Sequence, residues 1–563
     1  MASVEYGAAH RLLLRLLRQG GAWNILLLAA GLASAAAYIA FPAVLGRIVD
    51  AVLHGTDPGR FVAVAGLLVF LFVLTDAACE LAVTSASARS TAWLRHRLIR
   101  HLLDLGPRRP ARFTPGEAAG RVVSSTAEAG RVTPMAAWCA TSVAPALGGL
   151  AALVVIDPLL GLVFLLATPL LIGLIRLLLA RSSTAAVEYL RVQGEIGARL
   201  TEALAGARTI AAAGTQDREA ERVLAHLGDL GRHGQRMWRA QGNIAAAGAL
   251  LAPLLEVAVL GTAGVLLTRG RLSTGELLAA SQYVLLAAGL PAPLAFLARF
   301  ARARAAAARV TEVTSVAPPG YGETCLAGDG GGRLEFRAVT VRLAGQTVLR
   351  GLDLAVPAGA LVAVVGRSGA GKSTLAALAG RLLDPDDGEV LLDGVPLPRL
   401  SRADLRRSVA YGFDRPVLIG RTVHQAVALG CPAPAELVVS AVRAARADEF
   451  VRRLPAGYGT SMANAPLSGG EAQRLGLARA FVRPARVLVL DDATSNLDTI
   501  TELQISAVLT GELGGRTRLV VAHRAGTAAR ADLVAWLENG RVRRLATHEE
   551  LWRDVEYRAV FGP

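Results

Sequence analysis

Residues 366–373, Gly366-Arg367-Ser368-Gly369-Ala370-Gly371-Lys372-Ser373, decide the fold of the second half of this 563-residue chain. They match the pattern G-x-x-x-x-G-K-[ST], follow the apolar run LVAVV and precede the helix-forming run LAALAGRLL. This is the strand, loop and helix context in which the pattern holds a nucleoside triphosphate. Its glycines let backbone N–H groups face the phosphates at a helix N-terminus. The sequence therefore predicts an ATP-binding loop that extends to Thr374.

Lys372 is the only lysine in a chain with 60 lysine and arginine residues in all. Its ammonium is predicted to reach the β- and γ-phosphate oxygens, and the Ser373 hydroxyl is predicted to ligate Mg²⁺. A composition that otherwise uses arginine keeps lysine where a compact ammonium fits and a planar guanidinium does not. The isolated lysine therefore strengthens the prediction of a phosphate site.

The first half of the chain differs in composition, because it consists mainly of long apolar stretches. The whole chain is 53% hydrophobic with a mean hydropathy of +0.43, which indicates that part of it lies in lipid. A spanning helix needs about 20 mostly apolar residues. Six stretches of that kind occur, at residues 23–45, 61–83, 133–156, 159–180, 244–267 and 277–300.

The connectors between these stretches alternate in length and charge. Those after the second and fourth stretches are long and rich in arginine, including Arg97 and Arg100 in one and Arg218 and Arg222 in the other. Because such connectors stay on the cytoplasmic side, we expect a multi-pass plasma-membrane protein with both termini in the cytoplasm. This orientation explains the net charge of +15, and no aromatic-interleaved basic tract favours nucleic acid.

Helical periodicity continues through the long connectors, as in TAWLRHRLIRHLLDL, which predicts membrane helices that extend beyond the bilayer. Separate amphipathic surface helices are the alternative. The proline and glycine of APPGYGETCLAGDGGGR mark a linker, after which short β-branched runs alternate with helical patterns. We therefore expect a polytopic α-helical membrane domain at 1–315, a linker at 316–332 and an α/β nucleotide-binding domain at 333–563.

A second chemical motif follows about 120 residues after the loop. The apolar run from Val487 to Leu490 ends in Asp491 and Asp492, which is the pattern of a buried strand that delivers carboxylates at its end. Asp491 is predicted to hold Mg²⁺, as carboxylates do in phosphoryl-transfer sites. A strand that ends in a solvated acidic turn is the purely structural alternative.

Three further motifs carry a resemblance to a known family. The sequence Ser468-Gly469-Gly470-Glu471, within LSGGEAQRLGLARA, resembles the signature motif of ATP-binding cassette (ABC) proteins. The stretch SNLD at 495–498 resembles the D-loop of that family. His523 in VVAHR resembles its switch histidine.

Six spans followed by one cassette resemble the half-transporter of the ABC exporter branch, so the resemblance covers nearly the whole chain. It implies that two cassettes pair head to tail, with each ATP between the phosphate loop of one and Ser468, Gly469 and Gly470 of the other. It also implies that ATP binding and hydrolysis switch the spans between inward-facing and outward-facing states. A second half-transporter, ATP, Mg²⁺ and a lipid bilayer are the implied partners.

Three positions depart from the family pattern. The catalytic glutamate that usually follows the Mg²⁺-binding aspartate is replaced by Asp492, whose side chain is one methylene shorter. The glutamine that senses Mg²⁺ and water corresponds to Asp414. The aromatic residue that stacks on adenine corresponds to Leu343.

These departures favour a heterodimer in which this chain supplies a weakly hydrolysing phosphate loop and lends an intact signature to its partner. A homodimer with two slow sites stays open, because Asp492 is a carboxylate and His523 is retained. An ATP-binding regulatory subunit and an importer built on the exporter layout are the alternative functions.

Candidate contacts to the transported substrate are carboxylates within the predicted spans, because charged groups there are costly and mark function. Asp76 and Glu80 lie one helical turn apart in the second stretch, and Glu256 lies in the fifth. An interhelical hydrogen bond or a structural carboxylate is the alternative role. The cargo itself is expected to be an amphipathic small molecule, a peptide or a lipid.

Overall fold

The computed structural model describes residues 2–106, 115–288, 292–328, 330–343 and 345–562. These residues form two compact units, the first from residues 1–100 and 115–315 and the second from residues 101–114 and 316–563.

Among its described residues, unit 1 consists of helices and short connecting loops, as predicted for a membrane domain. Its helices are α1 (Ala2–Gln19), α2 (Ala22–Leu53), α3 (Gly59–Leu105, whose last residues belong to unit 2), α4 (Pro115–Gly120), the π-helical turn η1 (Arg121–Ser125), α5 (Thr126–Gly130), α6 (Val132–Ile156), α7 (Pro158–Ala205), α8 (Ala207–Ala213), α9 (Gln216–Leu224), α10 (Leu227–Thr268), α11 (Thr274–Ala287) and α12 (Ala292–Thr314).

The first five predicted spans lie in α2, α3, α6, α7 and α10. The sixth predicted span, residues 277–300, covers most of α11 and the start of α12, and residues 289–291 between these helices lie outside the described part. Within the described residues, α2 and α3 are long and apolar enough to cross a membrane, and shorter apolar segments occur at Val143–Ile156 and Pro253–Thr268.

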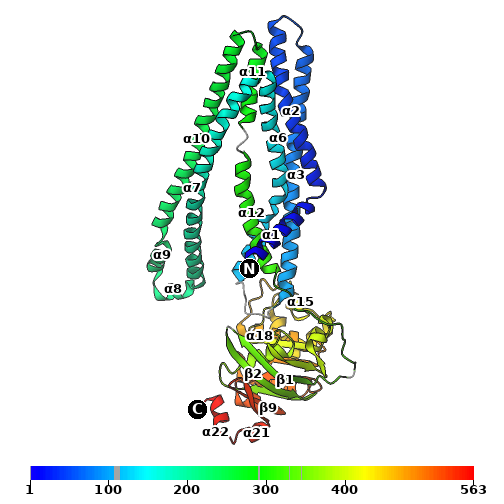
Figure 1. The fold of residues 1–563 in the computed structure, drawn as a ribbon. Helices are drawn as coiled ribbons and strands as arrows, with labels where there is room; N and C mark the ends of the chain where they lie inside the picture. The colour runs from blue at the N-terminus through cyan, green and yellow to red at the C-terminus, as the bar shows by residue number, and fades with distance from the viewer. Residues whose placement is uncertain (1, 107–114, 289–291, 329, 344, 563) are drawn as a thin grey trace. The chain divides into compact units, whose positions relative to one another are not determined.

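Three helices extend far beyond the predicted spans. Helices α3, α7 and α10 contain 47, 48 and 42 residues, whereas a span needs about 20. Figure 1 shows α7 and α10 running side by side to the short helices α8 and α9. The predicted helical extensions are thus confirmed, and the alternative of separate surface helices holds only for short elements such as α8 and α9.

The loop between α10 and α11 contacts the C-terminal end of α2 and the N-terminal end of α7. Asp157 caps α7 by accepting from Leu159 N (2.9 Å), with Pro158 in the first turn, and forms an ion pair with Arg271 at 2.6 Å. Asp50 of α2 accepts from Ser273 Oγ and Gly275 N, both at 2.7 Å. Two carboxylates therefore fix this loop against α2 and α7.

Unit 2 contains two sheets. Its strands are β1 (Leu334–Leu343), β2 (Gln346–Val356), β3 (Leu361–Val365), β4 (Asp387–Leu392), β5 (Val395–Pro396), β6 (Val409–Phe413), β7 (Val487–Asp491), β8 (Thr517–Val521), β9 (Leu533–Glu538) and β10 (Arg541–Ala546). A four-stranded antiparallel sheet has the order β2-β1-β4-β5, and a six-stranded sheet has the order β10-β9-β3-β8-β7-β6, parallel except for β10. The predicted α/β domain is therefore confirmed.

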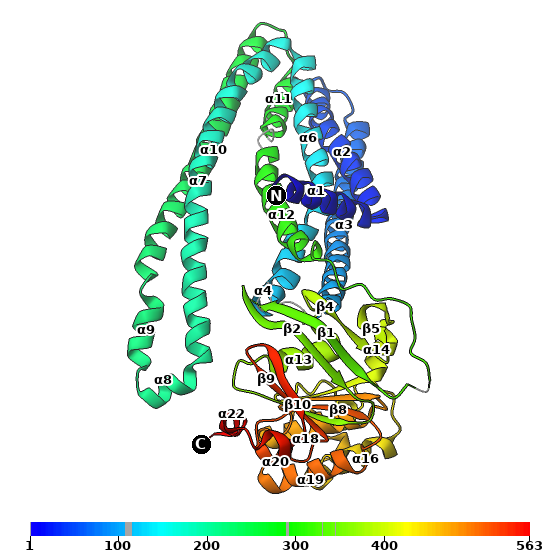
Figure 2. The same ribbon diagram turned by 60° about the horizontal axis from the view of Figure 1, so that its bottom comes forward.

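Unit 2 also contains ten α-helices in the described residues. They are α13 (Lys372–Ala379), α14 (Arg402–Ser408), α15 (Val423–Val427), α16 (Ala435–Ala444), α17 (Asp448–Arg453), α18 (Gly469–Phe481), α19 (Thr499–Thr510), α20 (Ala525–Ala528), α21 (His548–Leu551) and α22 (Val555–Arg558). Figure 2 shows α16, α18 and α19 gathered along one side of unit 2.

Strand β7 divides the core of unit 2 in two. Val487 and Val489 pack with α13 and the four-stranded sheet, whereas Leu488 and Leu490 pack with α16, α18 and α19. Alternate side chains of a strand point to opposite faces of its sheet. Helices α13 and α18 therefore lie on opposite faces of the six-stranded sheet.

The close approach of α2 and α11 yields a stability prediction. A Cβ on Gly275 would collide with the Gly46 carbonyl oxygen and the Asp50 carboxylate, whereas a Cβ on Gly264 would meet nothing within 4 Å. Gly275→Ala should cost about 1–3 kcal/mol through overpacking. Thermal unfolding of the detergent-purified chain should show a lower midpoint for Gly275→Ala. The midpoint of the control, Gly264→Ala, should not decrease. Equal midpoints for the two variants would contradict tight packing at Gly275.

Candidate functional site

The predicted phosphate loop connects β3 to α13 in unit 2, as the motif requires. Gly371 has a φ of +99°, and a Cβ there would come within 2.6 Å of Leu349 Cδ2. A Cβ on the buried Gly366 would collide with the carbonyl oxygen of Leu537. Arg367, Ser368 and Gly369 are exposed. The two flanking glycines are therefore needed for packing, while the middle of the loop stays open to a ligand.

Lys372 lies inside this loop, with 6% of its surface exposed. Its Nζ donates to the carbonyl oxygens of Gly366 at 2.8 Å and Arg367 at 3.1 Å. Burial lowers the pKa of Lys372, and the nearby Asp492 and Asp491 carboxylates oppose that shift. The ammonium is thus held at the loop by backbone carbonyls, where phosphate oxygens can replace them as partners.

Asp491 ends β7 beside the first turn of α13. Burial raises the pKa of Asp491, a hydrogen bond with the Ser373 side chain lowers it, and the Asp492 charge raises it. Its Oδ1 is buried without a hydrogen-bond partner. The Ser373 hydroxyl and the Asp491 carboxylate, one oxygen of which is unsatisfied, are oxygen ligands of the kind that a hard divalent cation prefers. Ser373 and Asp491 therefore fit as the residues that would hold Mg²⁺, which would neutralise the charge that develops on the phosphates of ATP.

Two predicted catalytic residues meet directly. His523 Nε2 lies 2.9 Å from Asp492 Oδ1, within ion-pair range although not aligned as a hydrogen bond. Asp492 has a φ of +52°, a left-handed conformation that aspartate adopts more readily than most residues. The short side chain of Asp492 is therefore directed at His523.

The third predicted catalytic residue, Asp414, follows β6 and is engaged by the D-loop. Its Oδ1 accepts from Ser495 Oγ at 2.8 Å and from Asn496 Nδ2 at 3.1 Å. Arg415 lies 3.6 Å from its other oxygen. The carboxylate that is predicted to correspond to the family's glutamine is thus bound within its own chain.

Gln473 of α18 joins these elements and was not predicted. Its Nε2 lies within hydrogen-bond distance of Asp414 O (3.3 Å), Asp492 O (3.2 Å) and Ser495 Oγ (3.4 Å), and its Oε1 accepts from Asn496 N (3.2 Å). Only 1% of its surface is exposed. The available sequence indication was a glutamine on the apolar face of the helix after the signature.

The signature forms the N-terminus of α18. Ser468 caps the helix by accepting from Glu471 N, and Glu471 accepts in return from Ser468 N at 2.8 Å. Ser468 and Gly469 are exposed, and Gly470 is half-buried. Helices α13 and α18 pack on opposite faces of the sheet, and the residues at the end of β7 contact both, through Ser373 and Gln473.

The remaining predicted residues lie apart from this cluster. Leu343 ends β1 opposite Gln346 and packs, half-buried, against the core that contains α13. Asp76 and Glu80 are exposed on α3, and Glu256 is half-buried on α10. Within the described cavities, Glu80 lines one in unit 1, and neither Asp76 nor Glu256 lines any.

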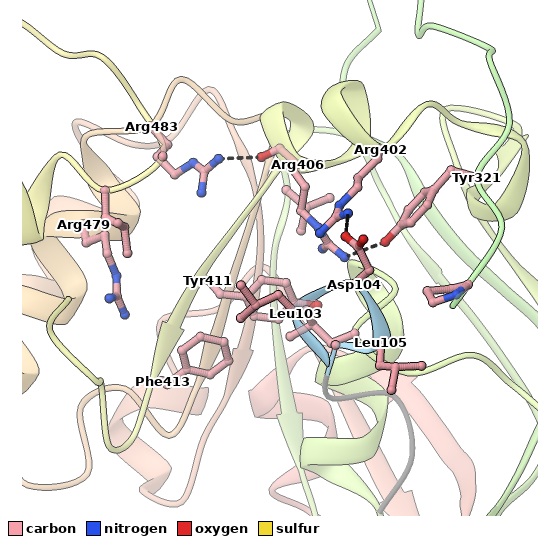
Figure 3. Close-up of a pocket in the computed structure, with 16 residues that line it drawn as sticks. Leu103, Asp104, Leu105, Tyr321, Arg402, Arg406, Tyr411, Phe413, Arg479 and Arg483 are labelled. Atoms are coloured by element: carbon pink, nitrogen blue, oxygen red, sulfur yellow. Dashed lines mark hydrogen bonds and ion pairs between the residues drawn. The ribbon is translucent and has the colours of Figure 1, made fainter. Parts of the chain in front are cut away.

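A cavity of about 460 Å³ in unit 2 lies beside β6 (Figure 3). Arg402 Nη1 donates to Asp104 Oδ1 at 2.8 Å, and Arg406 Nη2 donates to Tyr321 Oη at 3.3 Å. The stacked rings of Tyr411 and Phe413, 5.3 Å apart, line the same cavity. Strand β6 then ends directly before Asp414, so this cavity and the catalytic cluster share one strand.

The Gln473 network yields a prediction. Gln473→Leu should remove the partners of the Asp414 carbonyl oxygen and the Asn496 N–H, at a cost of about 1–3 kcal/mol. The control is Gln425→Leu, whose exposed amide accepts one backbone bond from Arg421. Gln473→Leu should lower the thermal midpoint and weaken ATP binding, measured with a fluorescent ATP analogue, more than the control does. Equal effects of the two substitutions would rule out a central role for Gln473.

Comparison with known proteins agrees with this geometry. Residues 349–495 match the family described as ABC transporter, and residues 24–288 match the ABC transporter transmembrane region. The ABC transporter ATP-binding protein RamA of Streptomyces coelicolor is 45% identical over 544 residues, which cover 96% of this chain and 86% of that protein. The ATP-dependent lipid A-core flippase of Pseudomonas fluorescens is 36% identical over 55% of this chain and 54% of its own length.

A solved structure of a bacterial Atm1-family ABC exporter with ATP bound is similar over nearly the full length. The TM-score is 0.80 at 26% identity, covering 97% of this chain and 98% of that one. This chain shares with these proteins a fused membrane part and ATPase part and an exporter-like fold. Its phosphate loop lies within the matched ATPase region. The chain belongs to the ABC transporter family, as an exporter-type half-transporter in which an ATPase drives export across a membrane.

Proposed function

We propose that this chain is the subunit of a heterodimeric exporter that supplies the weakly hydrolysing phosphate loop. The observation that carries the proposal is the state of Asp414, whose carboxylate is bound by Ser495 and Asn496 of its own D-loop. A residue engaged in this way is poorly available to orient water or Mg²⁺. The phosphate loop around Lys372 is complete, so binding of ATP and Mg²⁺ is retained while hydrolysis is weak.

Asp492 supports the same conclusion. A general base must come within hydrogen-bond reach of the proton that it removes. The aspartate is one methylene shorter than glutamate, and its carboxylate lies against His523 at 2.9 Å. The contact between Asp492 and His523 is also compatible with slow ATP hydrolysis at this site. It therefore favours a homodimer with two slowly hydrolysing sites as the second candidate.

The phosphate loop and the signature lie at the N-termini of two different helices, α13 and α18, and head-to-tail pairing with a second chain would complete each ATP site. The signature around Ser468 and Gly469 is exposed, and so is the middle of the phosphate loop. ABC exporters generally dimerise, and a partner cassette with a catalytic glutamate would use this chain's intact signature. The second site, formed by this chain's phosphate loop and the partner's signature, would bind ATP with little turnover.

The membrane arrangement follows from charge. Long arginine-rich connectors support cytoplasmic placement of the cassette and of both termini in a multi-pass plasma-membrane protein. Transport would move an amphipathic small molecule, a peptide or a lipid outward. Closure of the cassettes around ATP would reach the spans through the long helices α3, α7 and α10.

Substitution of Lys372 tests the asymmetry. Lys372→Ala should weaken ATP binding by this chain at least about tenfold, because hydrogen bonds to a charged partner are lost. Lys372→Arg should also weaken it, because the guanidinium does not fit the loop. The co-expressed pair should keep most of its ATPase rate with either variant. Loss of nearly all hydrolysis by the pair would show that this chain's own loop is the working site.

Restoring the family residues tests the cause of the weak hydrolysis. Asp492→Glu alone should raise turnover little, since Asp414 stays bound to the D-loop. Asp492→Glu combined with Asp414→Gln should raise it by about a hundredfold or more, the usual contribution of a positioned general base. The measurement is phosphate release by the purified chain, with Asp414→Gln alone as the control. Fast turnover by the unmodified chain would contradict the proposal.

A further inference from the structure

Glu502 is a buried carboxylate of unit 2 that belongs to none of the predicted motifs. It lies one turn into α19, the helix that follows the D-loop, and 7% of its surface is exposed. Its Oε1 accepts from Thr527 Oγ1 at 2.7 Å, and its Oε2 forms an ion pair with Arg524. Removing a carboxylate from water is costly unless its oxygens find partners, so these two contacts are what makes a charge acceptable at this position.

Both partners of Glu502 belong to the segment that carries the predicted switch histidine. Arg524 directly follows His523 and is the N-cap residue of α20, and Thr527 lies within α20. Thr527 N donates to Arg524 O at 3.2 Å, so the two partners are also joined through the backbone. Ala528, at the end of α20, is fully buried. The carboxylate of Glu502 therefore fixes the start of a short helix immediately after His523.

His523 depends on its chain neighbours for its position. Its side chain is 51% exposed, and its Nε2 lies 2.9 Å from Asp492 Oδ1. On one side of it, Ala522 N donates to Val364 O at 3.0 Å, which ties the backbone to β3. On the other side, the tie is the ion pair of Arg524. Because holding an exposed side chain in one orientation costs conformational entropy, the direction of His523 relies on the backbone being fixed on both sides.

The same carboxylate connects this segment to the D-loop. Asp498 ends the D-loop and caps α19 by accepting from Thr501 N at 2.9 Å, and Glu502 N donates to Asp498 O at 2.9 Å. Earlier in the D-loop, Asn496 N donates to Gln473 Oε1 at 3.2 Å. The D-loop is therefore tied to α18 through Gln473 and to α20 through Glu502.

These contacts close a ring around the carboxylate that follows β7. The ring passes through Asp492, His523, Arg524, Glu502, the D-loop at 495–498 and Gln473, whose Nε2 lies 3.2 Å from Asp492 O. Helix α19 is itself anchored, because Ile505 and Leu509 are buried in the core that contains α18. The segment of His523 is thus held against a helix that is fixed in the core of unit 2.

We propose that Glu502 is a positioning residue for ATP hydrolysis, which holds His523 against Asp492 through Arg524 and Thr527. A small displacement of a group that acts on the reacting atoms lowers the rate of the chemical step more than it lowers binding. The hydrogen-bond partners described for Glu502 lie outside the phosphate loop, so ATP binding should be retained when Glu502 is changed. This role concerns the ATPase reaction itself and goes beyond the subunit type proposed above.

Glu502→Gln tests the assignment, because it keeps the size of the side chain and removes its charge. Phosphate release is measured on the full chain in detergent, with the chain in excess over radiolabelled ATP so that slow hydrolysis is resolved. The rate should fall about tenfold or more, while the affinity for a fluorescent ATP analogue stays the same. An unchanged rate would overturn the proposal. So would an equal fall in rate and affinity, which would indicate a general loss of structure.

A double-mutant cycle determines whether Glu502 acts through His523. His523→Ala should lower the rate by itself, and Glu502→Gln combined with His523→Ala should hydrolyse ATP no more slowly than His523→Ala alone. Losses that multiply in the double variant would contradict action through His523, and so would an unchanged rate of His523→Ala.

Asp448→Asn is the matched control, because Asp448 also combines a hydroxyl partner with a guanidinium partner. It accepts from Tyr458 Oη at 2.6 Å and from Arg452 Nε at 3.0 Å. Its helix α17 and the turn at Gly457–Gly459 carry none of the predicted site residues. Asp448→Asn should lower the thermal midpoint without slowing hydrolysis. The proposal fails if this control slows hydrolysis as much as Glu502→Gln does.

Hydrogen exchange provides a measurement that does not depend on turnover. Exchange of the backbone amides of residues 522–528 should be faster in Glu502→Gln than in the unmodified chain and unchanged in Asp448→Asn. Glu502→Gln combined with Arg524→Gln leaves no unpaired charge from this pair and should slow hydrolysis as much as Glu502→Gln alone. Unchanged exchange in Glu502→Gln overturns this assignment alone, whereas fast hydrolysis by the unmodified chain overturns the proposed subunit type alone.

Discussion

Alternation of side chains along β7 is the constraint on which the ATP site depends. Val487 and Val489 belong to the core beneath α13, and Leu488 and Leu490 belong to the core beneath α18. The strand ends at Asp491 and Asp492 follows it, so one short segment supports the phosphate loop, the signature helix and both carboxylates. Since a strand places successive residues on opposite faces, the same strand supports α13 on one face and α18 on the other.

The buried amide of Gln473 converts this scaffold into a connected cluster. It binds the backbone of Asp414 and Asp492 and the D-loop at once. Asp414 is also held through its side chain by Ser495 and Asn496. The two positions at which the sequence is predicted to depart from the family pattern, 414 and 492, thus both contact Gln473 through their carbonyl oxygens.

The membrane unit uses charge in two different ways. Asp157 and Asp50 are buried or half-buried carboxylates with full sets of partners, and they fix the loop between α10 and α11. Glu80, Arg131, Arg299 and Arg302 instead line a cavity, together with Glu128. Carboxylates whose oxygens all have partners hold helix ends in place, whereas these charged side chains border open space.

The sequence by itself determined the features whose residues are contiguous. The phosphate loop, the signature, the acidic end of β7 and five of the six apolar stretches depend on local pattern, because period, glycine placement and strand-loop-helix order are properties of short segments. Tertiary structure alone decided the engagement of Asp414 with Asn496, the contacts of Gln473, and the gathering of Glu80, Arg131 and Arg302. The physical reason is that these contacts join segments far apart in the chain, and their geometry is set by packing of helices and strands, which no local pattern encodes.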